Sequence, residues 1–302
     1  MLTRYAQHNL TWVDLVAPTP QEVRALMDEF GIDPVISEEL LAPSSKSKAE
    51  RRGEHLYLVL HFPTLRSLSG RPEAEIDFVV GKHFLITTRY ANIDPLHSFA
   101  KAFEVNSVLG RGEAEHGGAL FVGMVRDLYH SLLAESDRLH ERLNEIEDRI
   151  FSGREREMVT HISAAGRMIH DFRRTLEPHV LMLQSLEPQG ERIFGAGFGY
   201  RIRTAIGELE RVRHTLEHLR EWLMELRETN NSLLSTKQND IMKNLTVMAF
   251  ITFPLTLFSS LFAIDAKHKP IVGMAYDFWI ILGIMLCTAL GFFVFFKHKK
   301  WL

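Results

Sequence analysis

The first of two apolar stretches near the C-terminus carries its small and polar residues at helical spacing. Steps of three or four residues from Asn239 stay on one side of a helix. The positions reached are Asn239, Met242, Leu245 or Thr246, Ala249, Thr252 or Phe253, Thr256, Ser259 or Ser260, and Ala263. Hydroxyl groups without a charged neighbour suit a water-filled passage shared by several copies of the helix. Close helix packing through small residues is the alternative that this pattern leaves open.

The remaining reactive side chains do not form an arrangement typical of an enzyme. The single cysteine, Cys287, lies within an apolar stretch, and no nucleophile stands beside a base at a recognisable spacing. His214 and His218 are four residues apart, with Glu221 one turn further, which can place metal ligands on one helical face. Because only two imidazoles converge within one chain, a solvated helix face is the favoured interpretation.

Two apolar stretches, Leu245–Ile264 and Phe278–Phe296, contain no Asp, Glu, Lys, Arg or His, and a short polar loop separates them. About 20 apolar residues, rising about 1.5 Å each, cross a hydrocarbon core about 30 Å thick. Each stretch is therefore long enough to span a bilayer. The sequence predicts a water-soluble domain followed by a terminal membrane hairpin.

Charge sets the expected orientation and partners. Lysines lie at both outer ends of the hairpin and in its loop: Lys237 and Lys243 before it, Lys267 and Lys269 in the loop, and Lys297, Lys299 and Lys300 after it. Since cytoplasmic flanks are enriched in Lys and Arg, both termini are expected in the cytoplasm of a multi-pass protein of the bacterial inner membrane. A formal net charge of −3 offers no basic field for nucleic acid.

The N-terminal part alternates helix and strand patterns. Thr19-Pro20-Gln21-Glu22 predicts a capping box at the start of a helix. Glu54–Phe62 and Ala74–Arg89 are rich in β-formers, and Gly81-Lys82 interrupts the second run as a hairpin turn does. A small α/β domain is expected. Its Asp and Glu residues follow no motif spacing and are expected on the solvated surface.

Long helical periodicity begins at about Gly117. Breaks at Ser152-Gly153 and at Pro188–Gly199 predict two long helices and then a third. The third runs from about Tyr200 to Ile264, close to 100 Å, because no breaker separates its apolar stripe from the first span. The predicted division is 1–115 (cytosolic α/β domain), 116–244 (long cytosolic helices with the stalk), 245–264 (first span), 265–277 (periplasmic loop), 278–296 (second span) and 297–302 (basic cytosolic tail).

The run NDIMKNLTVMAFITFPLTLFSSLFAID (Asn239–Asp265) and the ending FKHKKWL resemble the pore helix and the basic Trp-Leu ending of the CorA metal-ion transporter superfamily. The resemblance implies an α+β cytosolic domain with long helices forming a funnel, and two C-terminal transmembrane helices. It further implies a homopentamer whose first span lines the pore and which holds no tight cofactor, only the transported cation. By matching position, the residues that face the lumen are Asn239, Met242, Leu245, Phe253 and Thr256. Among these, Leu245 and Phe253 are expected to form apolar constrictions. The resemblance also implies a basic collar that attracts anionic lipid, formed by Lys297, Lys299 and Lys300.

The chain departs from the family at the pore mouth. Ala263-Ile264-Asp265 occupies the place of the family's Gly-Met-Asn signature, and Gly273-Met274-Ala275 is interpreted as a coincidence. Asparagine carbonyls suit hydrated magnesium, whereas Asp265 carboxylates and the His268 imidazole suit zinc and other borderline metals.

This departure resembles the zinc-transporting, ZntB-like or CmaX-like branch of the family. We therefore expect a divalent cation channel or transporter that favours zinc. A magnesium, cobalt or nickel transporter is the alternative within the same class. A membrane-anchored regulatory or scaffold protein that does not conduct ions is the alternative from another class.

Overall fold

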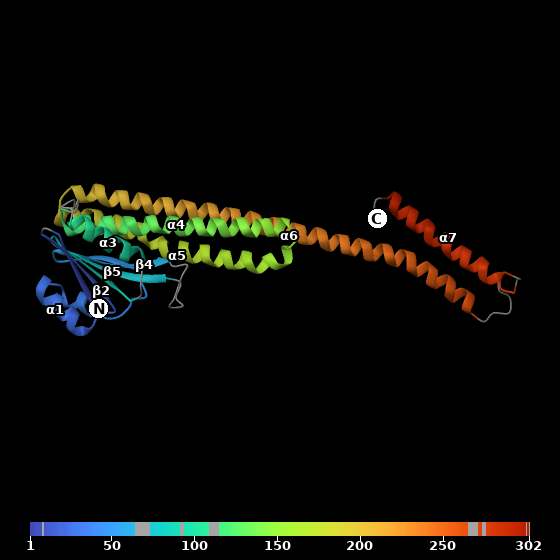
Figure 1. Ribbon diagram of the computed structural model, residues 1–302, viewed down its shortest axis with the longest axis horizontal. Coiled ribbons are helices and arrows are strands. Elements are labelled where there is room, and N and C mark those ends of the chain that lie inside the picture. The colour runs from blue at the N-terminus through green and yellow to red at the C-terminus, as the bar shows by residue number, and fades with distance from the viewer. Residues whose placement is uncertain are drawn as a thin grey trace. The chain divides into compact units, whose positions relative to one another are not determined.

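The computed structural model describes residues 1–7, 9–63, 73–90, 94–108, 115–264, 271–273, 276–299 and 301 (Figure 1). The chain divides into two compact units, Met1–Arg227 and Glu228–Leu302. One helix, α6 (Gly197–Ala263), contributes residues to both.

A six-stranded mixed sheet forms the centre of the first unit, in the order β1-β2-β6-β5-β4-β3. The strands are β1 (Leu2–Gln7), β2 (Leu10–Val16), β3 (Lys48–Arg52), β4 (His55–Pro63), β5 (Glu73–Val80) and β6 (Phe84–Arg89). Neighbouring strands are antiparallel except β2 and β6, which are parallel. The α+β fold class expected from the sequence is confirmed.

Helices cover both faces of this sheet. Figure 1 shows α1 (Pro20–Phe30) on one face, and α4 (Gly117–Phe151) and α5 (Glu155–Phe194) on the other. The short helix α2 (Pro34–Glu39) joins α1 in one apolar core, and α3 (Asp94–Val108) packs against α4 and β1. Because both faces are covered, nearly every residue of β4 and β5 is buried.

Two local predictions are confirmed. Thr19 caps α1 reciprocally with Glu22, which satisfies two backbone donors at the start of the helix. Gly81 lies between the paired strands β5 and β6, as the predicted hairpin requires. The start of α4 meets this turn so closely that a Cβ at Gly117 would lie 2.2 Å from the carbonyl oxygen of Gly81. Glycine is therefore the residue that fits at the start of α4.

The three long helices are present, with one correction to their predicted bounds. The break expected to begin at Pro188 begins later, because α5 continues through Pro178 and Pro188 to Phe194. The turn to α6 follows at Gly195, whose φ of 89° lies in the region that glycine tolerates. The third helix is continuous as predicted, from Gly197 to Ala263.

The apolar stripe of α6 faces the other long helices of the first unit. Its buried members include Ile202, Leu209, Val212, Leu216, Leu219, Leu223 and Leu226. Polar contacts border this seam: Arg173 of α5 forms an ion pair with Glu217 of α6 at 3.2 Å, and the His140 ring of α4 lies 4.9 Å from that of Trp222. Packing against α4 and α5 thus accounts for the stripe within a single chain.

Candidate functional site

The second unit contains the apolar end of α6 and the helix α7 (Asp277–His298). Both helices are long and apolar enough to cross a membrane. Only 6% of the apolar window in α6 and 0% of that in α7 are buried, so neither resembles the core helix of a soluble protein. Two C-terminal membrane helices are the remaining part of the fold class expected from the sequence.

One side of α6 packs against α7. Val247 is 2% exposed and Phe296 of α7 is 6% exposed. The rings of Phe250 and Phe296 lie 6.0 Å apart, and the Ser259 hydroxyl lies 4.0 Å from the Met285 sulfur. Aromatic and thioether contacts therefore hold the two helices together at both ends of the apolar region.

The predicted pore-facing residues lie on the opposite side of α6. At 100° per residue their mean direction is roughly opposite to that of Val247 and its neighbours along the α7 contact. Met242, Leu245 and Phe253 are 55%, 59% and 71% exposed. Asn239, Thr256, Ser260 and Ala263 are also exposed, and Ala249 is half-buried. The structure thus leaves this face open within one chain, available to other copies or to water.

Four hydroxyl groups in the apolar part of α6 donate their protons to the backbone of the same helix. The Thr256 hydroxyl donates to the Thr252 carbonyl at 3.0 Å, and the Ser260 hydroxyl donates to the Thr256 carbonyl at 2.9 Å. Thr246 and Thr252 make the same contact four residues back, each at 2.8 Å. The hydroxyl oxygens therefore present lone pairs outward, because their hydrogens are already engaged.

The predicted mouth of the pore is described only in part. Ala263 and Ile264 are exposed at the end of α6, whereas Asp265 and His268 lie outside the described residues. Gly273 donates its N–H to the Asp277 carboxylate at 3.1 Å and has a φ of 103°. This turn next to the start of α7 gives Gly273 a local structural role, whereas Met274 and Ala275 lie outside the described residues.

The predicted basic collar lies at the C-terminal end of α7. Lys297 is in the last turn and Lys299 follows it, and both are exposed; Lys300 lies outside the described residues. The Trp301 ring stacks on Phe296, with the ring centroids 5.8 Å apart. Positive charge at this end also complements the partial negative charge of the helix C-terminus.

Within the described ranges, no group of three or more His, Cys, Asp or Glu side chains is arranged to hold a metal ion. The two residues predicted to meet the transported metal, Asp265 and His268, are outside those ranges. Their predicted roles therefore stay predictions.

The expectation that the acidic residues of the N-terminal domain lie on its solvated surface is wrong for three of them. Asp14, Glu75 and Asp77 are 6%, 9% and 1% exposed. Asp14 forms an ion pair with Arg89 at 2.8 Å and accepts a hydrogen bond from Thr87. Their strands are covered on both faces, so alternation of polar and apolar residues does not mark a solvent side there.

Glu75 and Asp77 form a buried acidic pair on β5. The Glu75 carboxylate accepts from the Ser44 backbone N–H at 2.7 Å and lies 3.5 Å from His61 Nε2. The Asp77 Oδ1 atom has no hydrogen-bond partner among the described residues, and the Tyr90 hydroxyl lies 3.5 Å from Oδ2. Burial is the main cause that raises the pKa of Asp77, to about 9, and the charge of the neighbouring Glu75 is the second. Asp77 is therefore protonated at neutral pH.

A second buried titratable pair joins α4 to α5. The Tyr129 hydroxyl lies 2.9 Å from Nδ1 of His179, and both side chains are fully buried. Burial lowers the pKa of His179 to about 3, so this imidazole is neutral in the folded protein. Neither pair is predictable from the sequence, because a lone His or Asp in an apolar run carries no spacing signal.

A mixed-sheet domain, three long helices and two C-terminal helices apolar enough to cross a membrane define a protein with a folded domain joined to a membrane hairpin. The chain belongs to the CorA family: residues 7–298 match the model described as CorA-like Mg2+ transporter protein. This family consists of transporters and not of enzymes.

Individual relatives are distant in sequence and similar in fold. The cobalt/magnesium transport protein CorA of Thermotoga maritima is 22% identical over 295 residues, covering 97% of this chain and 83% of the relative. The complete CorA magnesium transporter structure from Methanocaldococcus jannaschii superposes with a TM-score of 0.85 at 18% identity, covering 99% of this chain and 93% of that one. The full-length CmaX structure gives a TM-score of 0.67 at 17% identity, covering 97% and 89%.

Proposed function

We propose that this protein carries divalent metal cations across the bacterial inner membrane, and that several copies of α6, five by analogy with the family, surround the path. Both termini lie in the cytoplasm in this proposal, and membrane lipid surrounds the outer helices. The observation that carries the proposal is the open face of α6. It bears Thr256 and Ser260 between exposed apolar residues and lies away from the α7 contact.

The chemistry of this face suits a cation with its hydration water. The Thr256 and Ser260 hydroxyls already donate to backbone carbonyls, so they offer acceptor lone pairs to a passing ion's water molecules. Water bound to a cation directs its hydrogens outward, toward such acceptors. An anion requires donors instead, and this part of α6 presents no Lys, Arg or His side chain.

In this proposal, Leu245 and Phe253 close the path to ions. Their side chains are 59% and 71% exposed in one chain, and rings of such side chains from several copies form apolar constrictions. A narrow apolar constriction excludes water and so blocks ions, until the helices separate. Opening then consists of a displacement of α6, with the ion moving down its electrochemical gradient.

Zinc, or a similar borderline metal, is the favoured cargo. The reason lies in the sequence at the mouth, where Asp265 supplies a carboxylate and His268 an imidazole in place of a neutral asparagine. Carboxylate and imidazole bind zinc directly at about 2.0–2.2 Å, whereas magnesium keeps most of its water. Lys267 and Lys269 oppose this preference by repelling cations. The chain is similar in fold to both a CorA and a CmaX structure, so the fold does not distinguish between the metals.

Ion flux into liposomes tests the proposal. Purified protein is reconstituted with an internal zinc or magnesium indicator, and the initial rates for the two metals are compared side by side. Thr256→Trp places bulk on the open face of α6 and is expected to abolish flux of both metals. Val294→Trp places the same bulk on an exposed position of α7, a residue 59% exposed, and is expected to leave flux near the parent rate.

Selectivity is tested by Asp265→Asn and His268→Ala in the same assay. Both changes are expected to lower the ratio of zinc to magnesium flux, because each removes a ligand that magnesium does not need. If the parent and both variants show the same ratio of zinc to magnesium flux, Asp265 and His268 do not set the metal selectivity, whereas transport itself is unaffected. Absence of flux for every divalent cation would instead favour a non-conducting membrane-anchored protein.

A further inference from the structure

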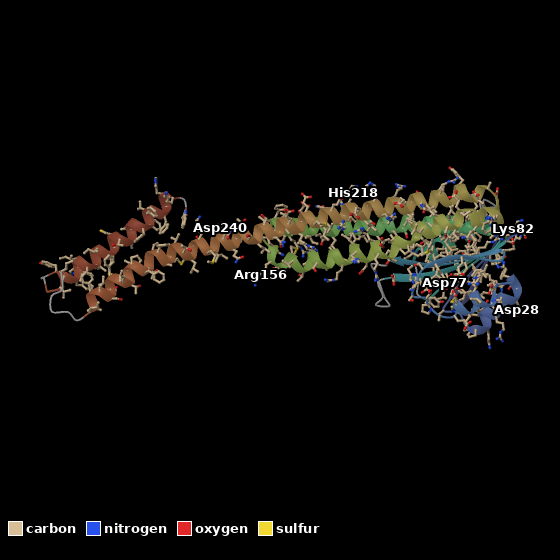
Figure 2. All side chains as sticks on the ribbon, turned by 180° about the vertical axis from the view of Figure 1, so that it is seen from behind. Asp28, Asp77, Lys82, Arg156, His218 and Asp240 are labelled. Atoms are coloured by element: carbon tan, nitrogen blue, oxygen red, sulfur yellow. The ribbon has the colours of Figure 1, made fainter. Side chains whose placement is uncertain are left out.

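Two histidines lie side by side on the exposed surface of α6, in the first unit and outside the membrane hairpin. The rings of His214 and His218 are stacked with centroids 4.5 Å apart and planes 18° from parallel. The His218 side chain is 68% exposed, and Figure 2 labels it on α6. Water and dissolved ions therefore reach both imidazoles without any rearrangement of the core.

The charges around this pair leave it accessible to a cation. The neighbouring arginines of α6 are each engaged by a glutamate three residues before them: Arg211 by Glu208 at 3.1 Å, Arg213 by Glu210 at 2.7 Å and Arg220 by Glu217 at 2.6 Å. Glu217 also pairs with Arg173 of α5. Local ion pairs thus offset the positive charge that would otherwise repel a metal from the two imidazoles.

A carboxylate supports one of the two rings. The Glu221 carboxylate lies 3.8 Å from Nδ1 of His218, and its side chain is 67% exposed. Histidines that bind metals commonly direct the other ring nitrogen to a carboxylate, which fixes the ring and raises its basicity. At 3.8 Å the carboxylate is beyond hydrogen-bond distance, and a side-chain rotation that brings it to Nδ1 leaves Nε2 of His218 for an ion shared with His214.

We propose that His214 and His218 form a cytosolic chelating site for one borderline divalent metal ion, such as zinc, nickel or copper, with water completing its coordination. Two nitrogens on one tetrahedral zinc ion, each about 2.0–2.1 Å from it, are roughly 3.4 Å apart. Rings whose centroids are 4.5 Å apart reach that separation through side-chain rotation alone. Magnesium is excluded from this site because it selects oxygen ligands in octahedral order.

The site has a mechanical consequence for α6. An ion held by residues four apart links consecutive turns, so the bound ion stabilises this stretch of helix against bending or unwinding. The same helix carries the open face proposed to line the path. The inference does not depend on conduction, since the binding is measured at equilibrium on the whole protein.

Zinc binding to the full-length protein in detergent tests the site. Metal-free protein is titrated with zinc by calorimetry and by competition with a chromophoric indicator. The double variant His214→Ala/His218→Ala is expected to lose one zinc equivalent per chain, and each single variant to bind that equivalent at least about tenfold more weakly. Magnesium titrations are expected to be the same for parent and double variant.

His170→Ala is the matched control. His170 is an exposed histidine of α5 whose positions four residues away hold Gly166 and Arg174, so it has no second imidazole on its face. This variant is expected to keep the parent zinc stoichiometry. Circular dichroism is expected to show that all variants keep their helices, because alanine is well tolerated at exposed helical positions. A double variant with the zinc stoichiometry and affinity of the parent would overturn the proposal.

Discussion

Replacing Asp77 by asparagine is expected to stabilise the protein at pH 8 and to change its stability little near pH 4. Asp77 is 1% exposed, and its pKa is raised from 3.8 to about 9 by burial and by the adjacent Glu75. Between these pH values the folded protein keeps the proton and the unfolded chain releases it. The contribution of Asp77 to the free energy of unfolding is therefore largest below pH 4 and falls as the pH rises toward 9.

The size of the effect follows from linkage. Each pH unit in this window changes the free energy of unfolding by at most about 1.4 kcal/mol, which sums to about 4 kcal/mol between pH 4 and pH 7. Asparagine has nearly the shape of the protonated carboxyl group and does not titrate, so Asp77→Asn removes this pH dependence. The difference in Tm between variant and parent is expected to grow by roughly 3 to 5 °C per pH unit.

Thermal unfolding of the full-length protein in detergent, followed by tryptophan fluorescence at pH 5, 6.5 and 8, measures this difference. Trp12 is fully buried in the same unit and reports its unfolding. Asp28→Asn is the control, because Asp28 is an exposed carboxylate on α1; Figure 2 labels both aspartates. A Tm difference between Asp77→Asn and Asp28→Asn that does not change with pH would refute the reasoning.

Three further predictions concern the first unit and use the same unfolding measurement. Gly117→Ala is expected to destabilise by at least about 2 kcal/mol, since its Cβ would meet the Gly81 carbonyl oxygen at 2.2 Å; Gly123→Ala, with nothing within 4 Å, is expected to stabilise by about 0.5–1 kcal/mol. Burial lowers the pKa of His179 to about 3, so below pH 6.5 the unfolded parent takes up a proton that the folded parent does not. The free energy of unfolding of the parent therefore falls by up to about 1.4 kcal/mol for each pH unit below 6.5, and His179→Gln is expected to lack this loss. Arg89→Leu leaves the buried Asp14 carboxylate without the guanidinium 2.8 Å away and is expected to cost about 3–5 kcal/mol; an unchanged Tm would contradict the assigned role of the pair.

Long periodic elements were predictable from the sequence. The stripe of α6 and the capping box at Thr19 each combine several local signals that agree, so the helices they predict are present. The helix end predicted at Pro188 is wrong, because a long helix packed against a sheet and a neighbouring helix tolerates a proline that would break an isolated helix.

The buried polar groups were not predictable. Glu75 and Asp77 alternate with apolar residues, a pattern typical of a strand with one solvated face, and only the helices packed on both faces bury them. The open face of α6 was predictable because side-chain direction follows from helical spacing alone. What that face meets lies outside a single chain, so no pattern within one sequence specifies it.

Water access to the open face of α6 tests the central claim most directly. In a Cys287→Ser background, Thr256→Cys is treated with a water-soluble, membrane-impermeant thiol reagent in liposomes, and Val294→Cys on α7 serves as the comparison. We predict that Thr256→Cys is modified and that its modification stops metal flux, while Val294→Cys stays unmodified and conducts as before. An unreactive Thr256→Cys with flux unaffected by the reagent would contradict the assignment of this face to the ion path.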